Sequence, residues 1–157
     1  MIERLSISER DRLRDIRLRA LKESPGVYCT TYGEATAFTD RDWDEQLLAL
    51  PTWVSTDCST DVGMVRGKLD PNGIDAWLLS MWVAPSHRRC GIAVALVGVV
   101  VEWARAEGRK RVILEVIDHN TPAVNLYDRL GFARTGRCGP FAEPRTHVLE
   151  HERALVI

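Results

Sequence analysis

The sequence predicts a mixed α/β fold in a single domain. The chain has 157 residues, which is an ordinary length for one domain. Segments with apolar residues at helical spacing alternate with short segments rich in β-branched residues. No linker and no internal repeat divides the chain. The expected order is a strand, two helices, three strands, a helix, a strand, a helix and two strands, all within one domain over residues 1–157.

The N-terminal part is expected to hold a short strand and a helix. We predict the strand at residues 2–5. Ser8 has the position of a helix N-cap, and Asp11 lies at the spacing of a capping box. Apolar residues then recur at helical spacing until the Pro-Gly pair at residues 25–26, which ends the helix.

A loop, a second helix and three strands are expected next. Residues 27–38 are rich in Thr, Tyr and Gly and are predicted to be a loop. Thr39 is expected to cap a helix that stops before Pro51. The helical period is then lost, and turn signals separate strands predicted at residues 53–56, 62–69 and 76–83.

The C-terminal half alternates helices and strands. A long apolar helix is predicted from residue 92 to 107, where Gly108 ends it. The remaining elements are a Val- and Ile-rich strand at 111–117, a helix that opens at Thr121-Pro122 and ends at Gly131, and two strands at 132–137 and 146–155.

Composition and charge exclude several classes of protein. The net charge of -1 and the pI near 6.4 give no overall positive field, so we expect no nucleic-acid partner. The longest apolar run, residues 92–101, is too short to cross a bilayer, and the charged N-terminus lacks a signal-peptide core, so no membrane partner is expected. The four cysteines form no CxxC pair. We therefore expect no metal site, free thiols and a cytoplasmic location.

A basic turn before the apolar helix is the first candidate site. A helix N-terminus presents unpaired N–H groups and the positive end of its dipole, so it favours an anion. Gly91 allows close approach of a ligand to the backbone, and Arg88 and Arg89 add positive charge and forked donors. A diphosphate matches such a site. Taken alone, the pattern is equally that of a strand-to-helix turn with solvated arginines.

A second motif follows at the start of the next helix. It comprises Asn120, Ala123, Tyr127 and the Gly131-Phe132 pair. Together with Arg88, Gly91 and Ala93, this motif resembles the GNAT superfamily of N-acetyltransferases, and the strong match runs from residue 77 to 132. The resemblance implies a mixed, mostly antiparallel central sheet flanked by helices. It also implies acetyl-CoA as the co-substrate.

The resemblance also implies roles for individual residues. The turn that cradles the pyrophosphate of acetyl-CoA through backbone N–H groups comprises Arg88, Arg89, Cys90, Gly91, Ile92 and Ala93. The pantetheine arm pairs with the backbone of Met81, Trp82 and Val83 on one side and contacts Asn120, with Ala123 in the same motif, on the other. Tyr127 protonates the departing thiolate. The plainer alternatives are a helix cap at Asn120 and a core aromatic at Tyr127.

The general base is not evident in the sequence. The strand before the turn, residues 77–82, carries no carboxylate, although family members often place a Glu there. Glu115 on the following strand is the candidate base, acting through a water molecule, and its alternative is a surface residue. Asp75 and Asp118 are weaker candidates.

The expected reaction is direct attack of a primary amine on the thioester through a tetrahedral intermediate. A small-molecule amine is the first choice of acceptor, and a peptide or protein amine is the second. Carboxylates interleaved with aromatic residues suit a cationic amine, or else they are helix caps and solvated faces; they are Glu23, Glu34, Asp40, Asp42, Asp44 and Glu45. An acetyl-CoA sensor without turnover is the alternative from another class. A homodimer is left open.

Overall fold

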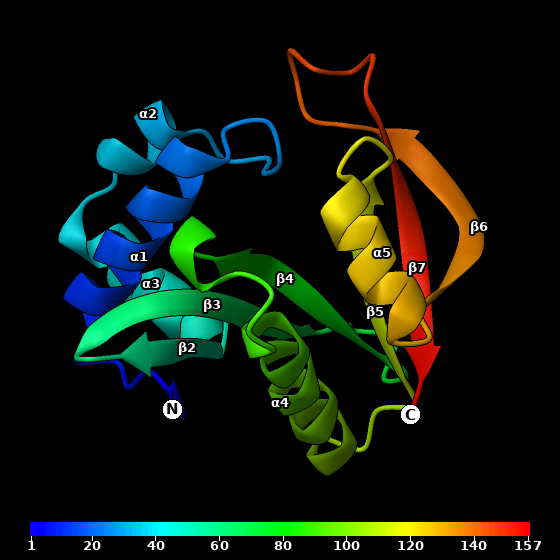
Figure 1. The fold of residues 1–157 in the computed structure, drawn as a ribbon, viewed down its shortest axis with the longest axis horizontal. Helices are drawn as coiled ribbons and strands as arrows, with labels where there is room; N and C mark the ends of the chain where they lie inside the picture. The colour runs from blue at the N-terminus through cyan, green and yellow to red at the C-terminus, as the bar shows by residue number, and fades with distance from the viewer. The chain divides into compact units, whose positions relative to one another are not determined.

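The computed structural model describes all 157 residues, Met1–Ile157, and contains seven strands in one sheet. The strands are β1 (Ile2–Arg4), β2 (Thr52–Asp57), β3 (Thr60–Leu69), β4 (Asp75–Val83), β5 (Arg111–Ile117), β6 (Ala133–Pro140) and β7 (Leu149–Val156). The helices are α1 (Arg10–Glu23), α2 (Tyr32–Thr36), α3 (Asp40–Ala49), the 3₁₀ turn η1 (Pro85–His87), α4 (Ile92–Ala106) and α5 (Thr121–Arg129) (Figure 1).

The sheet is mixed and mostly antiparallel, as expected. Its strand order is β1-β2-β3-β4-β5-β7-β6. Antiparallel pairs join β1 to β2, β2 to β3, β5 to β7 and β6 to β7. A parallel pair joins the first residues of β4 to β5, Asp75–Trp77 against Arg111–Ile113.

The chain packs as two compact units, and each unit is built from two segments. The first unit comprises residues 1–68 and 78–100, and the second comprises residues 69–77 and 101–157. The chain therefore passes from one unit to the other at the end of β3, within β4 and within α4. The expectation of one domain over residues 1–157 stays a prediction.

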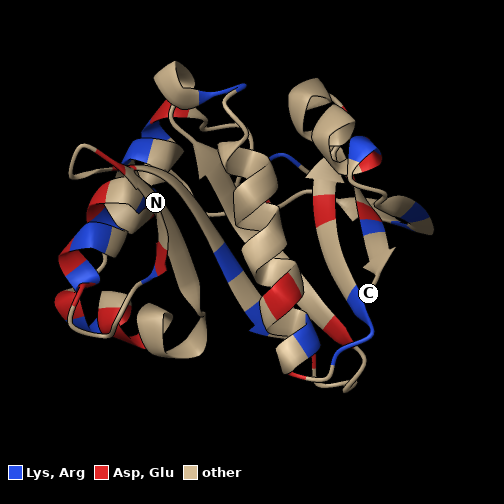
Figure 2. Cartoon of the chain, turned by 60° about the horizontal axis from the view of Figure 1, so that its bottom comes forward, with Lys and Arg blue, Asp and Glu red and all other residues tan.

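The core of the first unit lies between its helices and β2–β3. The apolar stripe predicted on α1 is buried there with one face of α3; the buried side chains include Leu13, Ile16, Ala20, Leu21, Trp43, Leu47, Val54 and Met64. Charged residues occupy the outer faces of α1 and α3, whereas α4, at the centre of Figure 2, is free of charge over most of its length. This is the pattern of helices that bury one face.

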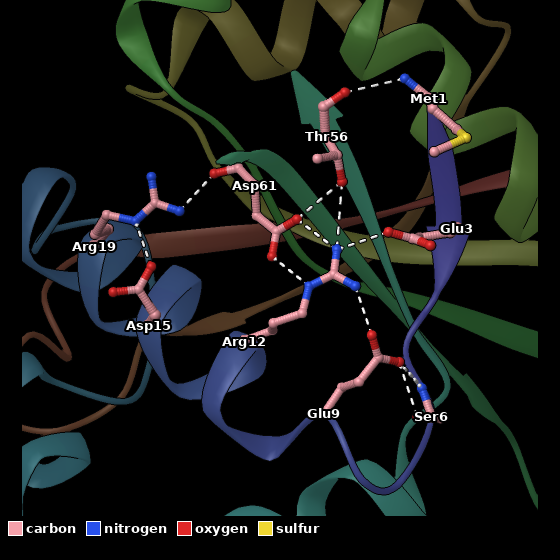
Figure 3. A network of polar contacts seen from close by, with 9 residues as sticks. All are labelled: Met1, Glu3, Ser6, Glu9, Arg12, Asp15, Arg19, Thr56 and Asp61. Carbon is pink, nitrogen blue, oxygen red and sulfur yellow. Dashed lines mark hydrogen bonds and ion pairs between the residues drawn. The ribbon is translucent and has the colours of Figure 1, made fainter. Parts of the chain in front are cut away.

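An arginine on α1 fastens that helix to the strands. Arg12 donates to Asp61 at 2.7 and 2.9 Å, to Glu3 at 2.8 Å and to Glu9 at 2.6 Å (Figure 3). A longer bond of 3.3 Å reaches the Thr56 hydroxyl. The hydrogen bonds to Asp61 are the main cause that raises the pKa of Arg12. One guanidinium thus links α1 with β1, β2 and β3.

The second unit has β5 at its centre. Three consecutive residues of β5 are buried: Val112, Ile113 and Leu114. Helix α5 packs on this part of the sheet (Figure 1), where its Asp128 accepts a hydrogen bond from the buried Arg153 of β7.

The start of α1 differs from the expectation. Ser8 does not cap the helix, which begins at Arg10 with Glu9 as its N-cap residue and without a side-chain cap bond. The Glu9 carboxylate instead accepts from the Ser6 amide at 2.7 Å and from Arg12. Asp11 pairs with Arg14 at 2.8 Å. Ion pairing has taken the acids that a capping box would use.

The predicted loop at 27–38 also needs correction, because it contains the short helix α2. Thr31 and Glu34 form a capping box, in which the Glu34 carboxylate accepts from the Thr31 amide at 2.7 Å. The expected cap at Thr39 is confirmed, since Thr39 and Asp42 form the same motif for α3. The Thr-x-x-Glu spacing at 31–34 was a readable signal for the missed helix.

Candidate functional site

The turn between η1 and α4 lies in the first unit and presents consecutive unpaired amides. Arg89 and Gly91 both have left-handed backbone conformations, with φ of 63° and 81°. The first bond of the helix runs from the Ala95 amide to the Gly91 carbonyl at 3.0 Å. The amides of Gly91 and of the first three helical residues, 92–94, therefore have no partner within the helix. Successive N–H groups in such a turn form a concave anion-binding nest, strengthened by the dipole of α4.

Gly91 is required by conformation and leaves space beside the turn. A Cβ placed on Gly91 meets no heavy atom within 4 Å. A side chain at this position is strained because of the positive φ, and it projects into space where a ligand can approach the amides. The turn therefore has room for an anion beside its amides, and the expected diphosphate stays a prediction.

The two arginines of the turn have different surroundings. Arg88 donates from Nε to the Val83 carbonyl at 2.9 Å and from Nη2 to the Glu23 carboxylate at 2.9 Å. Glu23 also accepts from the indole of Trp82 at 3.0 Å. The Arg88 side chain thus fixes the turn to β4 and α1. Its expected part as a forked phosphate donor stays a prediction. The Arg89 side chain is exposed, and we propose it as a donor to the phosphates.

The end of β4 carries the backbone groups expected to meet the pantetheine arm. Ser80 has φ of 55°, a left-handed conformation within the strand. The carbonyl of Met81 accepts from the Tyr28 hydroxyl at 2.7 Å, and that of Val83 accepts from Arg88. Each carbonyl has two lone pairs, so a ligand amide can still donate to it. The side chains of Trp82 and Val83 are buried.

The remaining turn residues have the surroundings of a surface. Cys90 is exposed, and its thiol lies 3.5 Å from the Arg88 carbonyl. Ile92 is partly buried against the core of the first unit, and Ala93 is half-buried.

In the second unit, the predicted site residues of α5 lie at the start of the helix and near its end. Asn120 is its N-cap residue, but the Asn120 side chain makes no cap bond. Ala123 is half-buried in the first turn. The Tyr127 side chain is buried and meets Phe132 edge to face, with the ring centroids 5.6 Å apart. The acid role of Tyr127 stays a prediction.

The candidate base Glu115 has a neighbour that the sequence did not reveal. Antiparallel pairing sets Ile117 opposite Glu150 and Glu115 opposite Glu152. Burial, followed by the charge and the hydrogen bond of Glu115, raises the pKa of Glu150 to about 7. Two carboxyl groups that share a proton near neutral pH are suited to general base catalysis. Pattern reading missed Glu150 because the register of two distant strands is not visible in the sequence.

The weaker candidate bases are held in ion pairs. Asp75 is buried and accepts from Arg111 at 2.7 and 2.9 Å, and these bonds lower its pKa. Asp118 pairs with Arg134 at 3.0 Å and with His151 at 3.0 Å.

The acidic residues of the N-terminal region have structural partners. Glu34 and Asp42 belong to capping boxes, Asp40 and Asp44 pair with arginines of α1, and Glu45 pairs with Arg41. The structure thus favours caps and solvated faces over a cradle for a cation.

Comparison with known proteins decides the family. The model of the Acetyltransferase (GNAT) family matches residues 12–132 of the chain. The chain belongs to the GNAT family. The match spans the turn at 88–93 and the whole of α5, so the resemblance read from the two motifs is confirmed.

The curated relatives of this GNAT chain are N-acetyltransferases. Human N-acetyltransferase 8 is 42% identical over 60 residues, which cover 38% of the chain and 26% of that protein. Rattus norvegicus N-acetyltransferase 8B is 39% identical over 80 residues, which cover 50% of the chain and 36% of that protein. The aligned part is therefore well under half of either relative.

Solved GNAT structures share the fold over nearly the whole chain. A GNAT acetyltransferase from Streptococcus pneumoniae has a TM-score of 0.85 at 18% identity, covering 100% of this chain and 98% of that one. The yncA protein of Salmonella typhimurium, solved with its cofactor acetyl-CoA, has a TM-score of 0.78 at 20% identity, covering 99% and 92%. No helix of this GNAT chain has the length and apolar character needed to span a membrane.

Proposed function

We propose that this chain is an N-acetyltransferase that moves the acetyl group of acetyl-CoA to a primary amine. The observation that carries the proposal is the run of unpaired amides at residues 91–94. A diphosphate is the anion that the family's co-substrate presents, and the exposed Arg89 adds a cation beside the amides.

The chemistry proposed is a direct transfer. The amine nitrogen attacks the thioester carbonyl carbon, a C–N bond forms, and the C–S bond breaks as the tetrahedral intermediate collapses. A backbone amide near Val83 stabilises the oxyanion. The proton lost by the amine goes to the Glu115–Glu150 pair through water, and Tyr127 protonates the thiolate. The roles of Asn120 and Ala123 toward the pantetheine arm belong to the same proposal.

We propose a small molecule as the acceptor and a reducing compartment such as the cytoplasm as the location. All four cysteines are exposed and none forms a disulfide, which suits a compartment that keeps thiols reduced. A peptide or protein amine is the second candidate, because one solved neighbour is the ribosomal-protein-S18-alanine N-acetyltransferase from Escherichia coli, at 18% identity and a TM-score of 0.74.

Calorimetric titration with acetyl-CoA, CoA and ATP tests the co-substrate. We expect micromolar binding of acetyl-CoA and CoA. The Gly91→Val change should weaken this binding at least about tenfold, because it disturbs several hydrogen bonds to a charged group. Gly98→Ala is the matched control: Gly98 lies on the exposed face of α4, and a Cβ there also meets no atom within 4 Å. Equal binding by both variants would contradict the proposed use of the turn.

Turnover separates the enzyme from a sensor. Acetylated product should appear by mass spectrometry when the chain is mixed with acetyl-CoA and a panel of amines and short peptides. Tight binding of acetyl-CoA without product from any of them would replace the enzyme by a binding module. Product from peptides alone would mean that the acceptor is a peptide or protein amine and not a small molecule.

A further inference from the structure

The first unit contains two buried arginines that no carboxylate neutralises. Arg17 of α1 is 6% exposed and Arg66 of β3 is 4% exposed. Arg66 donates to two neutral oxygens, Ser80 Oγ at 3.1 Å and Gln46 Oε1 at 2.8 Å. Arg17 has a buried Nη1 atom with no hydrogen-bond partner.

Their mutual repulsion makes this arrangement costly. Burial and the charge of Arg17 lower the pKa of Arg66 to about 9, and burial also lowers the pKa of Arg17. Arginine nevertheless stays protonated at neutral pH, so both positive charges persist. A buried charge without a counter-ion destabilises the folded chain, and most buried charges in proteins are paired.

Tyr28 connects the arginine pair to the candidate acetyl-CoA site of the same unit. The guanidinium of Arg17 lies over the Tyr28 ring, 4.7 Å from its centroid. The Tyr28 hydroxyl donates to the Met81 carbonyl at 2.7 Å, and Met81 belongs to the β4 segment proposed to meet the pantetheine arm. Tyr28 also lies on the irregular stretch between α1 and α2.

The carboxylate that acts on Tyr28 is already in use. Glu23 is close enough to help raise the pKa of Tyr28, for which burial is the main cause. Its carboxylate, however, accepts from Trp82 and Arg88 and has no ion pair with Arg17 or Arg66. The positive charge beside Met81 is therefore available to an anion that comes from outside the chain.

We infer that Arg17 and Arg66 form a subsite for the carboxylate of the acceptor, so that the acceptor is an amino acid or a similar amino carboxylate. This inference rests on the proposed function, because it names the substrate class of the same site. The carboxylate accepts a hydrogen bond from the unpartnered Nη1 of Arg17 and is attracted by the positive charge of Arg66. The Tyr28 ring shifts to admit the carboxylate. Guanidinium groups suit a carboxylate because their forked donors match its two oxygens.

Matched amines test the subsite. Amino acids, their C-terminal amides and the corresponding decarboxylated amines are offered with acetyl-CoA; histidine, histidinamide and histamine form one such set. We expect kcat/KM for the acid to exceed that for the amide by at least about thirtyfold, the usual loss when a buried charge pair is left half-made. Product is followed by mass spectrometry, because the four exposed cysteines of the chain would react with a thiol dye.

Variants assign the preference to the arginine pair. Arg17→Gln should reduce the ratio of acid to amide to about one while activity toward the amide persists. Arg17→Met serves if the glutamine variant does not fold. Arg14→Gln is the control, since Arg14 lies on the same helix but is exposed and paired with Asp11 and Asp40; it should keep the wild-type ratio.

A binding measurement keeps the subsite and the proposed function distinguishable. Free amino acids should raise the Tm of the wild-type chain and not of Arg17→Gln, whereas the amides should raise neither. If free amino acids raise the Tm but no acetylated product forms, the subsite is supported and the acetyltransferase proposal is overturned. Equal rates and equal Tm shifts for acids and amides, or no response to either class, would overturn the subsite. Preference for a phosphate-bearing amine such as phosphoethanolamine would overturn the carboxylate assignment.

Discussion

Two arginines on the same helix show how differently one side chain can be used. Arg12 has Asp61, Glu3 and Glu9 within 2.9 Å, and it joins α1 to three strands (Figure 3). Arg17 lies further along α1, is more deeply buried, and has an Nη1 atom without a partner.

The difference separates a structural charge from a charge kept for a ligand. The protein supplies every oxygen that Arg12 needs, so its interactions are complete in the free chain. Arg17 lacks such oxygens even though its burial makes them more necessary. A ligand that completes a buried polar group gains affinity for the same reason that the free protein loses stability.

The largest expected effect comes from removing the structural arginine. Arg12→Met leaves the Asp61 carboxylate, whose side chain is 10% exposed, without its counter-ion. Breaking such a pair should lower the free energy of unfolding by about 3 kcal/mol and the Tm by roughly 6–12 °C. Urea unfolding at pH 7 measures it, with Arg14→Met as the exposed control, expected to change stability by about 0–1 kcal/mol. Equal losses in the two variants would mean that the Arg12 cluster is not structural.

Replacement of Arg17 is expected to have the opposite effect on stability from replacement of Arg12. Replacing a buried cation that lacks a counter-ion with methionine of similar length should leave stability unchanged or raise it by about 1 kcal/mol. The same variant should lose its preference for carboxylate acceptors. Denaturation curves and the acid-to-amide ratio, measured on one preparation, test both statements. A loss of stability as large as that of Arg12→Met would show that Arg17 serves the fold and would remove the contrast.

The parts of the molecule predicted from sequence are those with local signals. The turn at 88–93 and the start of α5 rest on short motifs, and both lie on the expected elements. The helix that begins after Thr39 was also correct, because a capping box is a local pattern. The same reasoning applied to Thr31 and Glu34 would have found α2, and Ser8 failed because ion pairs at Glu9 and Asp11 replaced its cap.

The features missed in the candidate site depend on contacts between distant segments. Arg17 looks like one of many arginines on α1, although its position within the stripe of Leu13, Ile16 and Ala20 could have indicated burial. Arg66 comes near it only through the packing of β3 against α1. Glu150 meets Glu115 through strand register, which a single sequence does not define.

The smallest expected effect concerns a pair of acidic residues, Glu115 and Glu150, which repel one another as the two arginines Arg17 and Arg66 do. Glu115 and Glu150 are carboxyl groups without a cation between them, and the pKa of Glu150 is raised to about 7, above its ordinary value of 4.5. The native state therefore holds this proton more tightly than the unfolded state does. Its stabilising contribution is complete below about pH 4.5 and is lost as the pH rises through 7.

Glu150→Gln should consequently raise the Tm by a few degrees at pH 8, corresponding to about 1 kcal/mol, and leave it unchanged at pH 4. Glu115→Gln should give a similar gain, and the double variant should add little, because either change removes the same repulsion. Thermal unfolding between pH 4 and 9 measures these shifts.

In the proposed reaction, Glu115→Gln should also move the acidic limb of the pH–rate profile to lower pH, since the remaining carboxylate no longer has a charged neighbour. A Tm gain independent of pH would mean that the two groups do not share a proton, and the pair would then have no advantage over a single carboxylate as the base.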